Sequence, residues 1–370
     1  MGNTLSIIGR GTVGCLNALK FSNLGYDINW YQDPHISPLS VGEGADLSLS
    51  HFLSTELNFS YEDLIKIGGH HKHGIEKINW TKDTFTHWFE LGRSSIHINA
   101  TNLQNFIIDK ISSKVNIIEK NVKHSELGSY VIDCSGKPPL LEERNSTPIP
   151  VDSAYVVQCP WDKPKFSKTL CIAQEHGWVF LIPLQNRCSV GYLYNSNFSN
   201  IETIKTSVNN VFSQYNLTPT ESKNLSFNNF YRKHNFRGKF TYNGNSSFFL
   251  EPIEATSLNT AIAVIKQTDL LLKHEVSFKD ANKRYKNFLE ETIDIVMLHY
   301  LVDPPFDSPF WKMANQKAID WFTKRYKEYP RINIITQEGE YDYSTWYQES
   351  FKQNLKGLNL YEKLNQIKNG

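Results

Sequence analysis

The sequence predicts a mixed α/β protein that is built on a doubly wound nucleotide-binding domain, with an inserted antiparallel sheet and a C-terminal helical cap. A short apolar run at residues 5–8 precedes three glycines with G-x-G-x-x-G spacing. Residues 154–194 alternate apolar stretches with Pro and Gly, and the chain after Leu258 carries apolar residues at three- and four-residue spacing. These periods are typical of an antiparallel sheet and of amphipathic helices, respectively.

The opening motif reads as strand, tight turn and helix. Gly9, Gly11 and Gly14 follow the apolar run, and residues 15–24 have a helical pattern. Glycines at this spacing let the backbone approach a pyrophosphate, whose charge meets the free amides and the positive end of the helix dipole. The second strand, residues 27–32, is expected to end in an acidic residue for the ribose, but Gln32 precedes Asp33. The motif alone therefore leaves dinucleotide binding open.

The remaining elements follow in order. Residues 96–110 indicate a strand that runs into a helix, and residues 129–136 indicate a buried strand that closes on a glycine turn. Both suit a nucleotide-binding sheet. The predicted divisions are a nucleotide-binding domain from residues 1–150 and 238–270, an inserted sheet on the substrate side from residues 151–237, and a helical region from residues 271–370. Helices are predicted at residues 259–272, 278–300 and 309–327.

Composition excludes several classes of function. With 39 basic and 38 acidic residues the net charge is +1, which provides no field for a nucleic acid backbone. The five cysteines are odd in number and form no C-x-x-C pair, which favours reduced thiols in a cytoplasm and argues against zinc. No apolar run approaches the ~18 residues of a membrane helix. We therefore expect a cytoplasmic protein without a membrane partner.

Several later segments match blocks of one family in the same order. Val41-Gly42-Glu43-Gly44 is similar to a flavin loop, Lys72-His73-Gly74-Ile75 with Asn79-Trp80 to a lysine segment, and Phe249 to Ser257 to a third block. Together with residues 8–14, these segments resemble the flavin-dependent halogenases of the tryptophan halogenase type. The compact length also resembles the short halogenases encoded by marine phages. Further matching blocks lie at residues 97–100, 133–136, 158–160, 177–184, 191–194, 299–300 and 309–311.

The resemblance implies a fold and a cofactor. It implies an FAD-binding domain of the glutathione-reductase and hydroxybenzoate-hydroxylase type, with FAD supplied as FADH2 by a separate flavin reductase. It also implies a substrate side near Trp178 and Phe180, and no metal. The residues that it assigns to the cofactor are Gly9, Gly11, Thr12, Gly14, Val41, Gly42, Glu43, Gly44, Asp133 and Gly244.

The resemblance also implies a reaction. FADH2, O2 and a halide ion (chloride, bromide or iodide) give hypohalous acid, which is relayed to Lys72 and halogenates electron-rich phenols and indoles. Glu254 accepts the ring proton or polarises the hypohalite, and backbone amides of Thr256 and Ser257 hold the halide. A buried ammonium suits this role, and a Lys–Glu couple pairs both charges when dry.

Each assignment has a structural alternative. Lys72 could be a solvated lysine, with Lys77 as its nearest rival, and Glu254 could simply cap the following helix. Trp178 could be a core residue. The histidines His70, His71 and His73 have no acid or cysteine at ligand spacing, so a tunnel-lining loop is favoured over zinc.

The chain also departs from the family pattern. Phe180 replaces the second Trp of the W-x-W-x-I-P motif, which puts the exclusion of direct hydroxylation in doubt. Leu47 stands where a loop proline is expected, and Ala255 stands in place of Ser. The C-terminal part is shorter than in tryptophan-specific relatives, which predicts broad substrate tolerance.

Three hypotheses remain: a halogenase, a flavin-dependent aromatic monooxygenase, and a non-catalytic flavin-binding partner protein. The presence of both Lys72 and Glu254 favours the first. The native substrate, the preferred halide, the regioselectivity and the oligomeric state are not predictable from the sequence.

Overall fold

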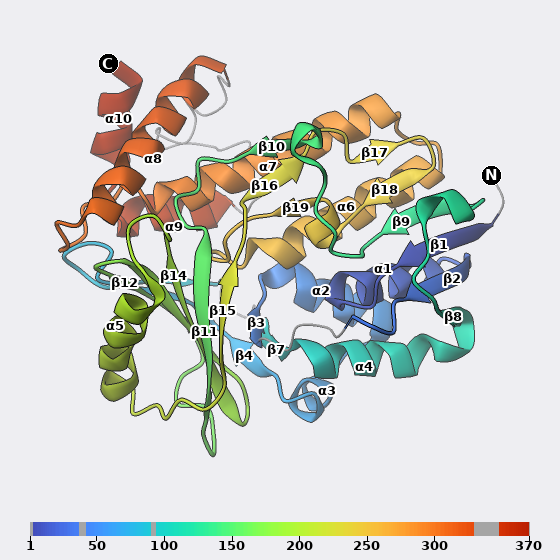
Figure 1. The fold of residues 1–370 in the computed structure, drawn as a ribbon, viewed down its shortest axis with the longest axis horizontal. Helices are drawn as coiled ribbons and strands as arrows, with labels where there is room; N and C mark the ends of the chain where they lie inside the picture. The colour runs from blue at the N-terminus through green and yellow to red at the C-terminus, as the bar shows by residue number, and fades with distance from the viewer. Residues whose placement is uncertain (1–2, 37–41, 90–93, 329–347, 370) are drawn as a thin grey trace.

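The computed structural model describes residues 3–36, 42–89, 94–328 and 348–369. It is a mixed α/β structure in which two large sheets lie side by side, and helices of the C-terminal part pack across them (Figure 1). The predicted fold class is confirmed, and the C-terminal helices are present.

The first large sheet has six strands in the order β17-β18-β9-β1-β2-β8. Apart from β17, its neighbouring strands pair in parallel. Leu5 and Ile7 of β1 point into a core shared with the helices α1, α2, α4 and α6, while Ile8 points to the opposite face. The strands are β1 (Thr4–Ile8), β2 (Asp27–Gln32), β8 (Val115–Glu119), β9 (Tyr130–Asp133), β17 (Phe236–Arg237) and β18 (Phe240–Tyr242), and the helices α1 (Thr12–Asn23), α2 (Leu47–Leu57), α4 (Ala100–Ile111) and α6 (Thr256–Leu272).

The second large sheet has seven strands in the order β15-β11-β14-β13-β12-β5-β6. Both faces are buried. Leu170 and Ile172 face α5, whereas Cys171 and Ala173 face the C-terminal helices, as the two-residue period of a strand requires. The strands are β5 (Gly74–Ile78), β6 (Phe85–Trp88), β11 (Ser153–Pro160), β12 (Thr169–Gln174), β13 (Gly177–Pro183), β14 (Arg187–Tyr194) and β15 (Ser222–Ser226), and α5 is Ile201–Gln214.

Two small sheets complete the strand pairing. One joins β3, β7 and β4, and the other joins β10, β16 and β19. The first of them places the end of β4 beside the flavin-loop segment, since β3 and β4 both pair with β7. The elements are β3 (Gly42–Gly44), β4 (His70–Lys72), β7 (Ser95–Asn99), β10 (Arg144–Ser146), β16 (Phe230–Arg232), β19 (Phe248–Phe249) and α3 (Tyr61–Lys66).

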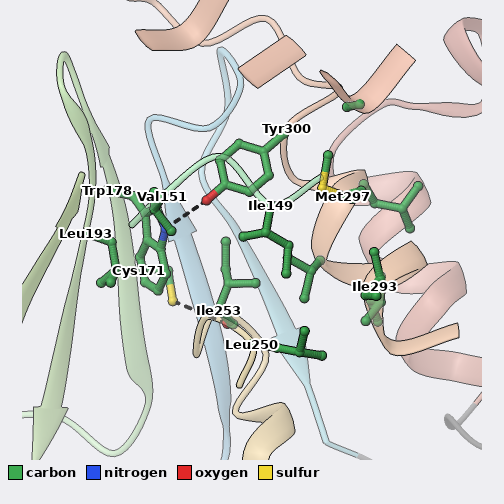
Figure 2. Close-up of a cluster of buried hydrophobic side chains, with 14 of the residues drawn as sticks. Ile149, Val151, Cys171, Trp178, Leu193, Leu250, Ile253, Ile293, Met297 and Tyr300 are labelled. Atoms are coloured by element: carbon green, nitrogen blue, oxygen red, sulfur yellow. Dashed lines mark hydrogen bonds between the residues drawn. The ribbon is translucent and has the colours of Figure 1, made fainter. Parts of the chain in front are cut away.

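The C-terminal helices begin close to the predicted positions. They are α6, α7 (Phe278–Leu298), α8 (Pro309–Glu328), α9 (Gln348–Gly357) and α10 (Tyr361–Asn369). Ser277 caps α7 by accepting a hydrogen bond from the backbone N–H of Asp280. Figure 2 shows where α7 meets the seven-stranded sheet, with Trp178 from a strand and Tyr300 from the helical side hydrogen-bonded across the core.

The predicted domain boundaries stay a prediction. The strands β5 and β6 come from residues 74–88 but belong to the seven-stranded sheet, beside strands from residues 153–226. Within the described residues, no helix combines the length and the apolar character that crossing a bilayer requires.

Candidate functional site

A cavity of about 1190 Å³ opens between the two large sheets. Its walls include the turn after β1, the end of β9, Phe180 and Ile182 of β13, and the segment that leads into α6. Cavities at the carboxyl ends of parallel strands are where nucleotide-binding folds hold their ligands.

The three glycines of the first turn have two different roles. Gly9 has φ +104°, and a Cβ there would lie 2.3 Å from the carbonyl oxygen of Cys134. A Cβ on Gly14 would lie 2.1 Å from the carbonyl oxygen of Gly9. Gly11, the residue before α1, would meet no described atom within 4 Å and lines the cavity. The protein's own backbone therefore requires two of the glycines, and the third leaves room for a ligand at the start of α1, where Thr12 also lines the cavity.

Asp133, at the end of β9, is a cavity residue held in a fixed position. Its carboxylate accepts hydrogen bonds from His124 Nε2 and the Ser135 backbone N–H, each at 2.8 Å. Burial alone would raise the pKa of Asp133, but these donors outweigh it and hold the pKa below its ordinary value. Gly244, with φ +61°, packs against α1 on the same cavity, and Asp33 also lines it. An ionised Asp133 is suited to accept hydrogen bonds from ribose hydroxyls or ring N–H groups.

The predicted flavin loop is described in part. Val41 lies outside the described residues, and for Gly42 and Glu43 only the strand β3 is described. Gly44 lines the cavity, and a Cβ placed on it would lie 3.7 Å from Lys72 Nζ. The ammonium group of Lys72 therefore lies directly behind the cavity wall at Gly44.

Lys72 is buried, with 1% of its surface exposed. Its Nζ donates a hydrogen bond to the carbonyl oxygen of Ala45 at 2.8 Å and lies 5.5 Å from the centre of the Phe89 ring. Burial lowers the pKa of Lys72 to about 8, while the nearby charge of Glu254 acts in the opposite direction. An ammonium group has three N–H donors, and the described residues fill one of them, so donors remain for a ligand.

Glu254 is buried with an ion-pair partner that the sequence analysis had treated as a rival to Lys72. Lys77 Nζ lies 2.6 Å from Glu254 Oε1, and no more than 1% of either side chain is exposed. His87 Nδ1 and His299 Nε2 lie 3.3 and 3.1 Å from the carboxylate oxygens, without the alignment of a hydrogen bond. Burial alone would raise the pKa of Glu254, but the adjacent charge of Lys77 outweighs burial and holds this pKa well below its usual range.

The expected direct pairing of Lys72 with Glu254 is thus replaced by a Lys77–Glu254 pair, with Lys72 close by. Spacing along β5 could have indicated a buried Lys77, because Ile75 and Lys77 share a face and Cys171 lies opposite Lys77 in the register. Which of the two lysines reaches Glu254 is not predictable from their spacing in the sequence.

The predicted halide site lies at the N-terminus of α6. Ala255 precedes the helix in the left-handed conformation, with φ +55° and ψ +37°. Ser257 is exposed on the cavity, and the buried Thr256 Oγ1 has no hydrogen-bond partner among the described atoms. Free N–H groups in the first turn and the positive end of the helix dipole suit a small anion.

The two predicted substrate residues lie in different surroundings. Trp178 is fully buried, and its Nε1 donates to Tyr300 Oη at 3.2 Å and to Glu251 Oε2 at 3.3 Å. Trp178 therefore occupies the core, as Figure 2 shows. Phe180 lines the cavity, and its ring lies against Gly191, where a Cβ would come within 2.1 Å of Phe180 Cζ.

The histidines of β4 and the following residue form no metal cluster. The His71 ring stacks between Tyr61, at 4.8 Å, and His73, at 5.8 Å between ring centres. Across the described part of the chain, no group of three or more His, Cys, Asp or Glu side chains could hold a metal ion.

A model of the tryptophan halogenase family matches residues 97–366. The chain belongs to the tryptophan halogenase family. The match begins after Lys72 and the glycine turn, so the roles of those residues rest on the geometry described above.

Similar proteins share this membership. Tryptophan 7-halogenase RebH of Lentzea aerocolonigenes is 27% identical over an alignment of 255 residues, which covers 62% of this chain and 47% of RebH. Tryptophan 6-halogenase ThaL of Streptomyces albogriseolus is 26% identical over 58% of this chain and 44% of its own length. The matches span about half the length of these curated relatives.

Solved structures show the same fold across the whole chain. The tryptophan halogenase from Shewanella frigidimarina superposes with a TM-score of 0.81 at 19% identity, covering 99% of this chain and 93% of that one. BrvH, a flavin-dependent halogenase from Brevundimonas sp. BAL3, also superposes with a TM-score of 0.81, at 18% identity, and the match covers 98% of this chain and 92% of BrvH.

Gly14→Ala and Gly11→Ala form a matched pair that separates folding from ligand binding. We expect Gly14→Ala to lower the free energy of unfolding by about 3 kcal/mol or more, because its Cβ meets backbone. Gly11→Ala is expected to fold with near-unchanged stability but to bind FAD more weakly. Urea unfolding and flavin fluorescence titration measure the two effects. Unchanged FAD affinity in Gly11→Ala would contradict the assigned role.

Replacing Lys72 with Met is expected to stabilise the fold. The pKa of about 8 in the folded protein, against 10.5 for a free lysine, corresponds to about 3 kcal/mol of destabilisation at pH 7. This penalty is complete below pH 8 and disappears as the pH rises to 10.5, because the unfolded chain then also loses the proton. Urea unfolding should give a higher free energy of unfolding for Lys72→Met than for the unmodified protein at pH 7, and the difference should shrink as the pH rises. The control is Lys82→Met, because Lys82 is exposed. A less stable Lys72→Met at pH 7 would contradict this account.

Proposed function

We propose that this protein is an FADH2-dependent halogenase that makes hypohalous acid in its large cavity and uses it at Lys72. The observation that carries this proposal is the position of the Lys72 ammonium, buried directly behind the cavity wall at Gly44, with the Glu254 carboxylate nearby. A cation that is hidden from solvent but adjacent to a cofactor cavity can receive a small oxidant from it.

The residues around the cavity fit FAD. Gly11 leaves space at the start of α1 for the pyrophosphate, and Asp33 and Asp133 offer carboxylates for the ribose or other hydrogen-bond donors. Bound FADH2 would supply two of the electrons that reduce O2, and the oxidising power left in the reduced oxygen would convert the halide ion into hypohalous acid. The first-turn amides at Thr256 and Ser257 would hold the halide on the same cavity.

Lys72 would bind and activate the oxidant. Two of its N–H donors are available for the oxygen of hypohalous acid. As the halogen moves to the aromatic ring, that oxygen leaves with a proton from the ammonium, as water. A pKa of about 8 makes both the ammonium and the neutral amine of Lys72 accessible near neutral pH. The neutral amine could instead react with hypohalous acid to give a haloamine on Nζ and water, and the haloamine would then transfer the halogen to the ring.

Glu254 would accept the proton that the ring carbon loses. Its pKa is held well below the usual range, so it is ionised and ready to accept. The whole change converts a ring C–H and hypohalous acid into a ring C–halogen bond and water.

Electron-rich phenols and indoles are the proposed substrates, and a separate flavin reductase is the proposed partner. The curated relatives are named for tryptophan, and the matched region covers about half of their length. Tolerance beyond tryptophan is the part of this proposal that the substrate panel tests.

A second candidate function is aromatic hydroxylation. Phe180, which replaces the second Trp of the family motif, lines the cavity directly. A substrate that reached the cavity could receive oxygen instead of halogen. The buried Lys72 has no task in that reaction, and neither does it in a non-catalytic flavin-binding partner, which is why halogenation is preferred.

Lys72→Ala is expected to abolish aromatic halogenation while FAD binding persists. The purified protein receives FAD, flavin reductase, NADH, oxygen and each halide in turn, and mass spectrometry detects halogenated product. Loss of the activating donor should lower product formation by about 10²-fold or more. The matched control is Lys82→Ala on the exposed turn that follows β5.

Catalase is included, because free peroxide oxidises iodide unaided. Oxygenated instead of halogenated product would favour the monooxygenase. Flavin binding without product under every halide would favour the non-catalytic partner.

A substrate panel tests tolerance. We expect product from several phenols and indoles under the same conditions, with relative rates that follow the electron density of the ring. Turnover restricted to tryptophan across the panel would show that broad tolerance is wrong.

A further inference from the structure

Two lysines are buried near Glu254, but only one of them forms an ion pair with it. Lys77 Nζ lies 2.6 Å from Glu254 Oε1, within hydrogen-bond distance. Lys72 instead donates to the carbonyl oxygen of Ala45. The two lysines therefore have different surroundings: Lys77 is neutralised by a carboxylate, and Lys72 is held by a neutral acceptor.

The fold fixes Lys77 in this place. It lies on β5, between β12 and β6, and in the register it is opposite Cys171 on one side and Phe85 on the other. A strand that is paired on both sides cannot turn its side chains over without losing both ladders. Lys77 Nζ also lies 5.9 Å from the centre of the fully buried Trp80 ring, which adds a second favourable contact for the charge.

The two imidazoles beside Glu254 cannot take the place of Lys77. His299 Nδ1 lies 2.9 Å from the carbonyl oxygen of Ile295, and because a carbonyl only accepts, Nδ1 carries the proton. Nε2 of the neutral ring is then a lone pair that faces Glu254 Oε1 at 3.1 Å. His87 Nδ1 is 3.3 Å from Oε2 but is not aligned for a hydrogen bond. Among the described residues, Lys77 is thus the donor that holds the carboxylate.

The other carboxylate oxygen is open. Glu254 Oε2 is buried and has no hydrogen-bond partner among the described residues. A buried carboxylate oxygen without a donor is costly, and such exceptions call for a functional reason. An oxygen kept free while its neighbour is held by Lys77 is suited to accept a proton.

We propose that Lys77 is a positioning residue for halogenation: it keeps Glu254 ionised, leaves Oε2 open for the ring proton, and keeps Glu254 from pairing with Lys72. This inference rests on the proposed function. In the step itself, the ring C–H bond breaks, its electron pair restores the aromatic ring, and the proton forms a bond to Oε2.

Two consequences follow for reactivity. Without Lys77, the desolvated Glu254 would either take up a proton from solvent or pair with Lys72. The first outcome removes the base, and the second raises the pKa of Lys72 and occupies its free donors. In the first case the ring proton loses its acceptor, and in the second the oxidant loses its donors at Lys72, while the reaction that makes the oxidant in the cavity is untouched.

The test compares three variants. Lys77→Met removes the charge and retains the length, and Lys77→Arg retains the charge. Lys168→Met is the matched control. Lys168 forms an ion pair at 2.7 Å with Glu76, which lies on β5 like Lys77, but each of these two side chains is at least one-fifth exposed. For each, aromatic halogenation is followed against pH, with ring-deuterated substrate in parallel, and oxidant is trapped with taurine in the absence of an aromatic substrate.

We expect Lys77→Met to trap as much oxidant as the unmodified protein but to halogenate aromatics about 10²-fold more slowly. The acid limb of its pH–rate profile should move to higher pH, because Glu254 then takes up a proton more readily. A primary deuterium isotope effect should appear, because proton loss from the ring becomes slow. Lys77→Arg should restore the pH profile at least in part, and Lys168→Met should match the unmodified protein. An unchanged acid limb and isotope effect in Lys77→Met, or an equal loss of trapped oxidant, would overturn the proposal.

A measurement on the unmodified protein tests the proposal even if Lys77→Met does not fold. Infrared difference spectra of protein labelled with ¹³C at the glutamate carboxyl carbons, with Glu254→Gln as the subtraction, report whether Glu254 is ionised. Ionised Glu254 at pH 5 supports the proposal, and a protonated carboxyl at pH 7 overturns it. If the unmodified protein produces neither trapped oxidant nor halogenated aromatic, the proposed function fails, whereas the infrared result still decides the state of Glu254.

Discussion

The buried ion pair of Lys77 and Glu254 joins the parts of the chain on which the site depends. Lys77 belongs to the seven-stranded sheet, and Glu254 belongs to the segment that leads from the six-stranded sheet into α6. Removing one partner from a buried pair costs about 3–5 kcal/mol, because the other charge is left without compensation. The pair therefore links β5 of the seven-stranded sheet to the segment that precedes α6.

The same arrangement separates two chemical environments. The cavity, lined by Gly11, Asp133 and Gly44, is wide enough for a large cofactor, while Lys72 and Glu254 lie behind its wall, almost without exposure. Gly44 lies between the two, because it lines the cavity and a Cβ placed on it would be 3.7 Å from the Lys72 ammonium, an ordinary van der Waals distance.

The sequence predicted the parts of the site that depend on backbone shape. The turn of Gly9, Gly11 and Gly14 follows from local rules, and the structure has it where it was expected, whereas α6 begins at Thr256, three residues before its predicted start. The partner of Glu254 could not be predicted in this way. Lys72 and Lys77 are five residues apart, but the chain passes from the small sheet of β4 into the large sheet of β5 between them. Which lysine meets Glu254 depends on how those sheets pack, and not on spacing.

The charges of the buried groups set the surroundings of Lys72. Lys77 and Glu254 cancel each other, and burial raises the pKa of Glu251 to about 8, so that this carboxyl is mostly protonated at neutral pH. Its Oε2 accepts a hydrogen bond from the Tyr300 hydroxyl at 2.7 Å. Burial also raises the pKa of Asp46, the acidic neighbour of Lys72. The Lys72 ammonium is thus a buried cation that donates its described hydrogen bond to a neutral carbonyl, and in a dry interior such a cation favours anions and polarised oxygens as ligands. The ligands proposed for it, a halide ion and hypohalous acid, are of this kind, and a neutral aromatic ring can approach it without bringing a charge of its own.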